Sequence, residues 1–203
     1  MTDCQRFVKR LFDISLSLVG LLSIGWIIVI VFFIASIDTK NNGFFLQKRV
    51  GKNGKFFKIL KIRTMRFSKY LITTVTISGD SRITVSGTFF RKWKIDELPQ
   101  LVNILLGQMS FVGPRPDVPG YANKLQGDDR IVLSVRPGIT GPAQLTYRNE
   151  EDILSDQIDV VRYNDEVIWP DKVKINKDYV KNYSFLKDIY YIWKTIVGGN
   201  VKY

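Results

Sequence analysis

The longest pattern in the chain is an apolar stretch from Ile14 to Ile37, which carries no charged side chain and consists mostly of Ile, Leu, Val and Phe. As a helix rising about 1.5 Å per residue, these roughly 24 residues would reach about 36 Å, enough to enter a bilayer deeply. The stretch is long for a signal peptide, and no small-residue cleavage site follows it. It therefore predicts a membrane helix rather than a leader or a buried core helix.

Basic residues flank this stretch on both sides: Arg6, Lys9 and Arg10 before it, and Lys40, Lys48, Arg49 and Lys52 after it. A spanning helix usually shows an imbalance of Lys and Arg, whereas a helix that returns to the same face can be basic at both ends. Gly20, Ser23 and Gly25 lie in its middle, where a bend would let freed backbone groups bond to a Ser hydroxyl. The pattern favours a re-entrant helix with both ends on the cytoplasmic side.

A soluble, basic domain follows this helix, so we divide the chain into a membrane element, residues 1–38, and a catalytic domain, residues 39–203. Its opening predicts a β-hairpin, with strands at 44–47 and 56–62 and a turn at Gly51 to Gly54. Residues 67–86 are polar and Thr-rich, which predicts a loop with short extended pieces.

Two later segments have the apolar spacing of helices. One opens at Asp96, has Pro99 in its first turn and stops at Gly107; its apolar positions are Leu98, Leu101, Val102 and Leu105. The other runs from a Ser184 cap to Gly198; its apolar face consists of Leu186, Ile189, Tyr190, Trp193 and Ile196. Core packing and residence in the lipid headgroup layer both explain this second helix. The predicted fold class is thus α+β and helix-rich, with one N-terminal re-entrant membrane helix and a domain that contains a small β-hairpin and amphipathic interfacial helices.

Composition restricts the chemistry. Among 203 residues there is no His and only one Cys, Cys4, which excludes His-dependent triads, His-containing metal sites and internal disulfides, and places the domain in a reducing compartment. The net charge of +11 calls for an anionic partner, and no nucleic-acid-binding module is present. Anionic lipid and phosphorylated substrates therefore remain as the expected partners.

The adjacent carboxylates Asp96 and Glu97 stand at a helix start, where acids are also favoured for electrostatic reasons alone. Cations surround them in the sequence: Arg91 just before, Arg115 between Pro114 and Pro116, and Arg136 before Pro137. Arginine on a rigid, Pro-fixed turn suits phosphate oxygens. Carboxylates among such cations indicate phosphate chemistry.

Five motifs occur in one order: Lys9–Asp13 (KRLFD), Phe57–Met65 (FKILKIRTM), Ile95–Gln100 (IDELPQ), Met109–Pro116 (MSFVGPRP) and Val135–Gly141 (VRPGITG). With them the chain resembles the bacterial sugar transferases, the monotopic phosphoglycosyl transferases, in their minimal catalytic form. The resemblance runs from about Lys9 to at least Gln144. The chain departs from it twice, because Ile24 follows Ser23 where relatives have a Ser-Pro pair, and Pro142 stands where an aromatic residue is usual.

The resemblance implies a two-step transfer at the cytoplasmic face of the bacterial inner membrane. Asp96 would attack the β-phosphate of a UDP-sugar, release UMP and hold the phosphosugar covalently, and polyprenyl (undecaprenyl) phosphate would then accept it. Glu97 would be the partner of Asp96 near a Mg²⁺ ion, so both are the expected metal ligands; magnesium needs only one or two carboxylates. By motif position, the cations expected at phosphate or uridine are Lys61, Arg63, Arg91, Arg115, Arg136 and Arg148. The product would start a surface glycoconjugate such as a capsule, an O-antigen, an exopolysaccharide or a glycoprotein glycan.

Two other functions fit parts of the pattern. A non-catalytic protein that binds anionic lipid or nucleic acid through its basic face would not need the Asp96–Glu97 pair. A phosphate hydrolase would use water instead of the lipid acceptor, but would gain nothing from a membrane helix. The sequence identifies neither the sugar nor the oligomeric state.

Overall fold

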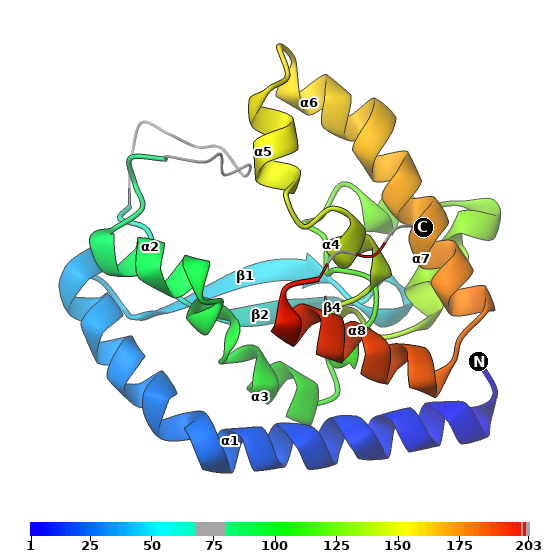
Figure 1. Cartoon of the computed structure of the whole chain (residues 1–203), viewed down its shortest axis with the longest axis horizontal. Coiled ribbons are helices and arrows are strands. Elements are labelled where there is room, and N and C mark those ends of the chain that lie inside the picture. Colours follow the sequence, from blue (N-terminus) through cyan, green and yellow to red (C-terminus); the bar gives the residue numbers. More distant parts are fainter. Residues whose placement is uncertain (68–79, 200, 202–203) are drawn as a thin grey trace.

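The computed structural model describes residues 1–67, 80–199 and 201. Its longest element is helix α1, Asp3–Thr39, which lies along one side of the molecule and bends partway along its length (Figure 1). Thr2 and Gln5 form a capping box at its start, and Lys40 ends it in a left-handed conformation. The Ser23 hydroxyl donates to the Val19 carbonyl oxygen at 2.8 Å, a contact that often bends helices.

The predicted hairpin is confirmed, and its first strand is longer than predicted. Strands β1, Phe44–Val50, and β2, Phe56–Ile62, pair antiparallel, and a short 3₁₀ turn, Lys52–Gly54, joins them. Asn53 and Gly54 take positive φ angles of 58° and 78°, which close the turn tightly. Ile28, Val31 and Ala35 of α1 pack with Ile62 at the end of the hairpin, so this half of α1 is anchored to that end.

The segment around Asp96 differs from the predicted continuous helix. Asp96 and Glu97 lie on a separate 3₁₀ turn, η2, Ile95–Glu97, and helix α3 begins only at Gln100 and ends at Leu105. Pro99 explains the break, because it has no N–H to donate and therefore cannot continue the hydrogen-bond ladder of a helix. The predicted stop is confirmed, since Gly107 has a φ of 78°.

Helix α2, Val85–Lys92, begins inside the range predicted as a loop and was not predicted. Most of that predicted loop, residues 68–79, lies outside the described residues. On its described flanks, Met65 and Ile83 form an isolated antiparallel bridge. Thr84 caps α2 with its hydroxyl, which accepts from the Gly87 N–H at 3.0 Å.

A second, parallel sheet lies in the part of the molecule formed by the C-terminal helices. It consists of β3, Ser110–Val112, and β4, Gly138–Thr140. The helices and turns around it are η3, Ala122–Lys124, η4, Gly127–Ser134, α4, Pro142–Thr146, α5, Glu150–Ser155, α6, Val160–Tyr163, a π-helical turn, Asn164–Ile168, α7, Trp169–Lys181, and α8, Phe185–Val197. Val112, Tyr179 and Tyr191 are buried together where β3, α7 and α8 meet.

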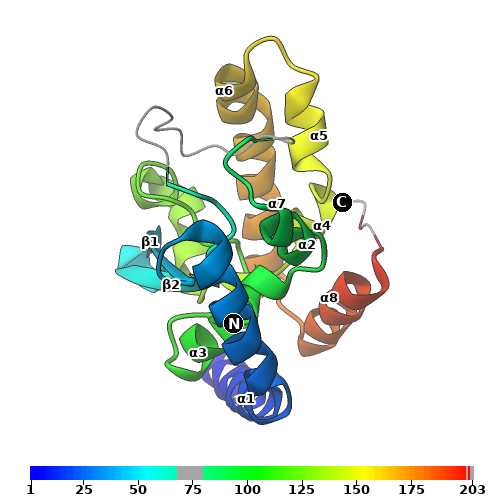
Figure 2. The ribbon, with the colours of Figure 1, turned by 90° about the vertical axis from the view of Figure 1, so that its left-hand side faces the viewer.

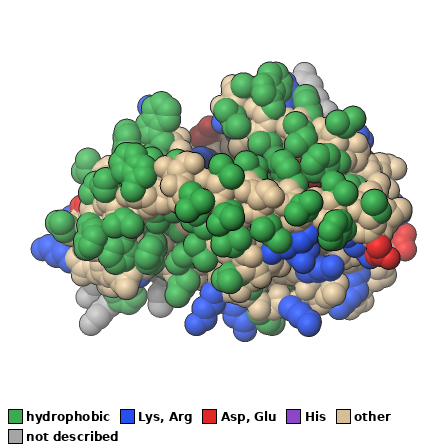
Figure 3. All heavy atoms as spheres, turned by 90° about the horizontal axis from the view of Figure 1, so that it is seen from below, with side chains coloured by type: hydrophobic (Ala, Val, Ile, Leu, Met, Phe, Trp, Pro, Cys, Tyr) green, Lys and Arg blue, Asp and Glu red, His purple; other side chains and the backbone are tan. Residues whose placement is uncertain are grey.

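Helices α1, α2 and α8 expose large apolar side chains. These include Leu11, Leu18, Leu22, Trp26, Val29, Phe33 and Ile37 of α1, Val85, Phe89 and Trp93 at α2, and Leu186, Ile189, Tyr190, Trp193 and Ile196 of α8. Figure 3 shows hydrophobic side chains over much of the face seen from below, with Lys and Arg along its lower margin. Within the described residues, α1 is the one helix long and apolar enough to cross a membrane.

The predicted helix from Ser184 to Gly198 is confirmed as α8, but its predicted apolar face is exposed, so the core-packing interpretation of that face is wrong. Asp188 and Tyr191 are its buried residues instead. Asp188 forms a buried ion pair with Lys9 of α1 and accepts from the Tyr179 hydroxyl at 2.8 Å. This contact holds α8 beside α1, as the end-on view in Figure 2 shows.

Candidate active site

The carboxylates of Asp96 and Glu97 lie on a short turn that is bounded by two distinctive backbone positions. Lys94 takes a left-handed conformation, with φ 56°, just before η2, and Pro99 ends the turn. Asp96 is buried, and its Oδ1 atom has no hydrogen-bond partner among the described residues. A buried carboxylate oxygen without a partner is costly, so its presence indicates an atom kept for a ligand or a reaction.

Glu97 is held by two of the predicted cations. Its Oε1 atom lies 2.9 Å from the Lys61 Nζ of β2 and 3.4 Å from an Nη atom of Arg115. The side chains of Glu97 and Lys61 are only 12% and 17% exposed, whereas that of Arg115 is 48% exposed. Burial raises the pKa of Glu97, but Lys61 and Arg115 outweigh this effect and hold the pKa well below its usual range.

Asp96 titrates in the opposite direction from its neighbour. Burial raises the pKa of Asp96, the negative charge of Glu97 raises it further, and Lys61, Lys94 and Arg91 oppose both effects without cancelling them. The environment thus separates the two pKa values, as in other pairs of carboxyl groups that perform different tasks. Glu97 is the fixed anion of the pair, and Asp96 is the more basic group.

Arg49, a residue not predicted for the site, lines the same pocket as Lys61, Glu97 and Arg115. Its guanidinium donates to the Pro116 carbonyl oxygen at 3.1 Å and to Gln47 Oε1 at 2.6 Å, while its Nε is buried without a partner in the described part of the chain. Burial, followed by the charge of Arg115, lowers the pKa of Arg49 to about 10. Strand alternation was the available signal, since Arg49 and Lys61 occupy the same face of the hairpin.

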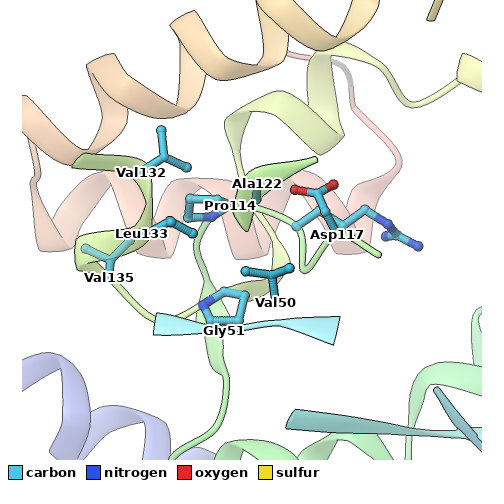
Figure 4. Close-up of a pocket in the computed structure, with 10 residues that line it drawn as sticks. Val50, Gly51, Pro114, Asp117, Ala122, Val132, Leu133 and Val135 are labelled. Carbon is cyan, nitrogen blue, oxygen red and sulfur yellow. The ribbon is translucent and has the colours of Figure 1, made fainter. Parts of the chain in front are cut away.

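A second, mainly apolar pocket adjoins Arg115 (Figure 4). Val50, Pro114, Leu133 and Val135 line it, and the Asp117 carboxyl is its acidic group. Burial raises the pKa of Asp117 to about 6, although Lys172, Arg49 and Arg115 oppose the shift. Sequence reasoning missed Asp117, because nothing in a Pro-Arg-Pro-Asp run shows that its last residue is half-buried at a pocket.

Of the other predicted cations, the structure brings Arg91 near the carboxylates, since its charge opposes the raised pKa of Asp96. Arg63 does not join them. Its Nε donates to the Asn42 carbonyl oxygen at 2.7 Å and an Nη atom donates to the Phe44 carbonyl oxygen at 3.3 Å. These bonds secure the connection between α1 and the hairpin.

Arg136 and Arg148 also lie at other places. The Nε of Arg136 donates at 2.8 Å to the carbonyl oxygen of Gly107, just past the end of α3, which is a favourable place for a cation. Arg148 is exposed and lies beside Gly198, at the end of α8. Within the described residues, neither side chain forms a hydrogen bond or ion pair with Asp96 or Glu97. That Arg136 and Arg148 contact the substrate stays a prediction.

The described residues contain no cluster of three or more Asp, Glu, Cys or His side chains that would enclose a metal ion. Magnesium does not need one, because it commonly binds one or two carboxylates and completes its shell with waters and substrate phosphates. The unpartnered Oδ1 of Asp96 is suited to such a contact. Lys61 and Arg115 already occupy Oε1 of Glu97, so Asp96 offers the more available oxygen.

A family model described as bacterial sugar transferase matches residues 4–200. The chain belongs to the bacterial sugar transferase family. As a member of this family it is a transferase, and the resemblance drawn from its five motifs is confirmed.

Three relatives illustrate the family. The exopolysaccharide production protein ExoY of Sinorhizobium fredii is 31% identical over 204 residues, which cover 93% of this chain and 83% of ExoY. The UDP-glucose:undecaprenyl-phosphate glucose-1-phosphate transferase of Escherichia coli is 30% identical, with 99% of this chain and 42% of the relative covered. The undecaprenyl-phosphate galactose phosphotransferase of Salmonella typhimurium is 32% identical, with 94% and 40% covered. The chain thus spans most of ExoY and about two-fifths of the two longer relatives.

Proposed function

We propose that this bacterial sugar transferase moves a sugar-1-phosphate from a UDP-sugar to a polyprenyl phosphate. The proposed acceptor is undecaprenyl phosphate. The observation that carries the proposal is a buried Asp96 carboxylate with an unpartnered oxygen, next to a Glu97 that cations keep ionised. The names of the Escherichia coli and Salmonella relatives support the same reaction class. The name of ExoY supports a product that enters an exopolysaccharide.

Asp96 is the nucleophile in this proposal. A carboxylate oxygen forms a bond to the β-phosphorus of the UDP-sugar, the bond from that phosphorus to the bridging oxygen breaks, and UMP leaves with the electron pair. An oxygen of the lipid phosphate then attacks the same phosphorus, the bond to Asp96 breaks, and the carboxylate is restored. The raised pKa of Asp96 makes its ionised form more nucleophilic than that of an ordinary Asp.

The cations make the attack of one anion on another feasible. Lys61 offsets part of the negative charge that Glu97 adds beside Asp96. Arg115 is half exposed at the pocket, where its guanidinium can grip the diphosphate, and Arg49 is the second guanidinium of the same pocket. Fixed cations of this kind stabilise the charge that develops on transferring phosphoryl groups.

Magnesium is the proposed cofactor, held by Asp96 with Glu97 beside it. When bound, it would neutralise charge on the diphosphate and help to align it. The residues of the chain determine the rest: the turn η2 places Asp96 beside Glu97, and the Lys61 contact sets the position of Glu97.

For membrane placement we propose that residues 1–38 form a re-entrant element, and that residues 39–203 form the catalytic domain on the cytoplasmic face of the inner membrane. The bend of α1 and the basic residues at both ends of its apolar stretch support a helix that returns to the same side. The exposed apolar face of α8 supports its location in the headgroup layer beside α1. A membrane location brings the site to the lipid acceptor.

The test is release of UMP by the purified protein in nanodiscs, with a panel of UDP-sugars, undecaprenyl phosphate and Mg²⁺. We expect one sugar to give UMP and a lipid-linked diphosphate sugar in equal amounts. Lipid-independent release of free sugar phosphate would instead indicate a hydrolase. Failure of every UDP-sugar to release UMP would overturn the proposed donor class.

A further inference from the structure

Asn103 of α3 makes an unusual connection to the hairpin. Its Oδ1 accepts from the backbone N–H of Leu60 at 2.9 Å, and its Nδ2 donates to the Lys58 carbonyl oxygen at 2.8 Å. The second Nδ2 proton is used by Gln108 Oε1 at 2.7 Å. A C=O and an N–H two residues apart on one strand edge are the groups that a neighbouring parallel strand would bind. The Asn103 amide, which is 3% exposed, thus takes the place of one residue of a further strand beside β2.

This connection joins β2 to α3, and the Lys61–Glu97 ion pair joins β2 to the turn η2 just before α3. Leu60 immediately precedes Lys61 on β2, and Glu97 lies on the turn just before α3. Apolar packing also joins β2 and α3, since Ile59 lies in one buried cluster with Leu101 and Ile104 of α3. Apolar packing is non-directional, so by itself it fixes the position of β2 along α3 less firmly than hydrogen bonds of defined geometry.

We propose that Asn103 is a positioning residue for the Lys61–Glu97 pair: its amide fixes β2 along α3 so that the Lys61 ammonium meets the Glu97 carboxylate. The residue touches neither substrate nor the reacting atoms, and it acts through Lys61. The inference deepens the proposed function, because it concerns the same carboxylate pair.

The experiment is a double-mutant cycle with Asn103→Ala, Lys61→Met and both together, measured as kcat and KM for UMP release. A control, Asn176→Ala, removes another buried amide, on α7, whose Oδ1 has no partner within the described residues. We expect Asn103→Ala to lower kcat/KM by about 10- to 100-fold, the usual size for residues that orient a functional group. Because Asn103 touches no substrate, the loss should appear in kcat more than in KM, as it should for Lys61→Met. The control should leave both constants unchanged.

The decisive comparison is made in the Lys61→Met background. If Asn103 acts through Lys61, adding Asn103→Ala to Lys61→Met should cause almost no further loss of rate. A change of up to about twofold counts as no loss, because additivity between independent sites holds only to about that factor. The same large loss in both backgrounds, or a loss by Asn103→Ala confined to KM, would overturn the proposal. If Asn103→Ala does not fold, Asn103→Asp takes its place, because it keeps the acceptor for Leu60 and loses the donor to Lys58.

Melting temperatures of the four proteins between pH 4 and pH 8 provide a second cycle that does not need catalysis. Coupling between Asn103 and Lys61 in that cycle supports the positioning role, and additive effects contradict it. If the wild-type protein releases no UMP, the proposed donor reaction is refuted. The melting cycle then still decides whether Asn103 positions Lys61.

Discussion

Replacing Lys61 with Met removes the nearer of the two cations at Glu97 and leaves a carboxylate whose side chain is only 12% exposed. Two unit charges about 4 Å apart interact by about 4 kcal/mol at an effective dielectric constant of about 20, which corresponds to about three pKa units. Arg115 remains at 3.4 Å but is half exposed, so it compensates only in part. We therefore expect the pKa of Glu97 to rise by about two to three units. The pKa of Asp96 should rise as well, because Lys61 also lowers it.

The assay is the pH profile of kcat/KM for UMP release between pH 4 and pH 8. Asp96 is the more basic of the two carboxyls and therefore sets the acid limb of the profile. Without Lys61, which lowers the pKa of Asp96 in the wild type, the acid limb of Lys61→Met should lie at higher pH than that of the wild type. Lys61→Arg is the matched control, because it keeps the charge and should keep the limb near its original position. A Lys61→Met protein with the acid limb of the wild type would refute the assigned role of Lys61.

Three further predictions test other parts of the account. Arg115→Lys should reduce kcat/KM by roughly 30- to 1000-fold, because the loss of a bidentate contact to the diphosphate costs about 2 to 4 kcal/mol. Arg136→Ala should mainly lower the melting temperature. Equal losses of rate in the two variants would place Arg136 among the residues that bind the phosphates. Asp117 binds a proton in the folded protein that the unfolded chain releases, so stability should fall as pH rises from about 4 to about 6. Asp117→Asn should abolish that slope and raise stability at pH 7 by up to about 3 kcal/mol, and an unchanged pH dependence of melting would contradict this. In a cysteine-free background, single cysteines near Thr2 and near Asn42 should react with an impermeant reagent from the same side, and opposite accessibility would show that α1 spans the membrane.

The parts of the fold that the sequence predicted correctly have long or regular apolar patterns. The stretch from Ile14 to Ile37, the alternation of the hairpin and the helical spacing after Ser184 each bury or expose a whole face, and each appears in the structure as α1, β1–β2 and α8. Strands β3 and β4 contain three residues each, which is too short for any periodicity to show. The sequence could not show whether the apolar face of α8 is buried or exposed, because a protein core and a membrane surface favour the same residues.

The site was predictable where a motif carries it. Asp96, Glu97, Lys61 and Arg115 come together as expected, although they derive from three separate motifs. Residues whose importance depends on tertiary contacts were missed, as with Arg49. The same limit applies to the other predicted arginines, because a cation that bonds to a backbone carbonyl, as Arg63 does, has the same sequence signature as one that awaits a phosphate.

The measurement that tests the central claim most directly is covalent labelling with a UDP-sugar carrying a radioactive β-phosphate, in the absence of any lipid acceptor. The wild-type protein should release one equivalent of UMP and retain the label, and mass spectrometry of its peptides should place the phosphosugar on Asp96. Adding undecaprenyl phosphate should then move the label to the lipid, and Asp96→Asn should retain none while staying folded and membrane-bound. Label retained by Asp96→Asn, or UMP released by the wild type only when the acceptor is present, would contradict a covalent intermediate on Asp96.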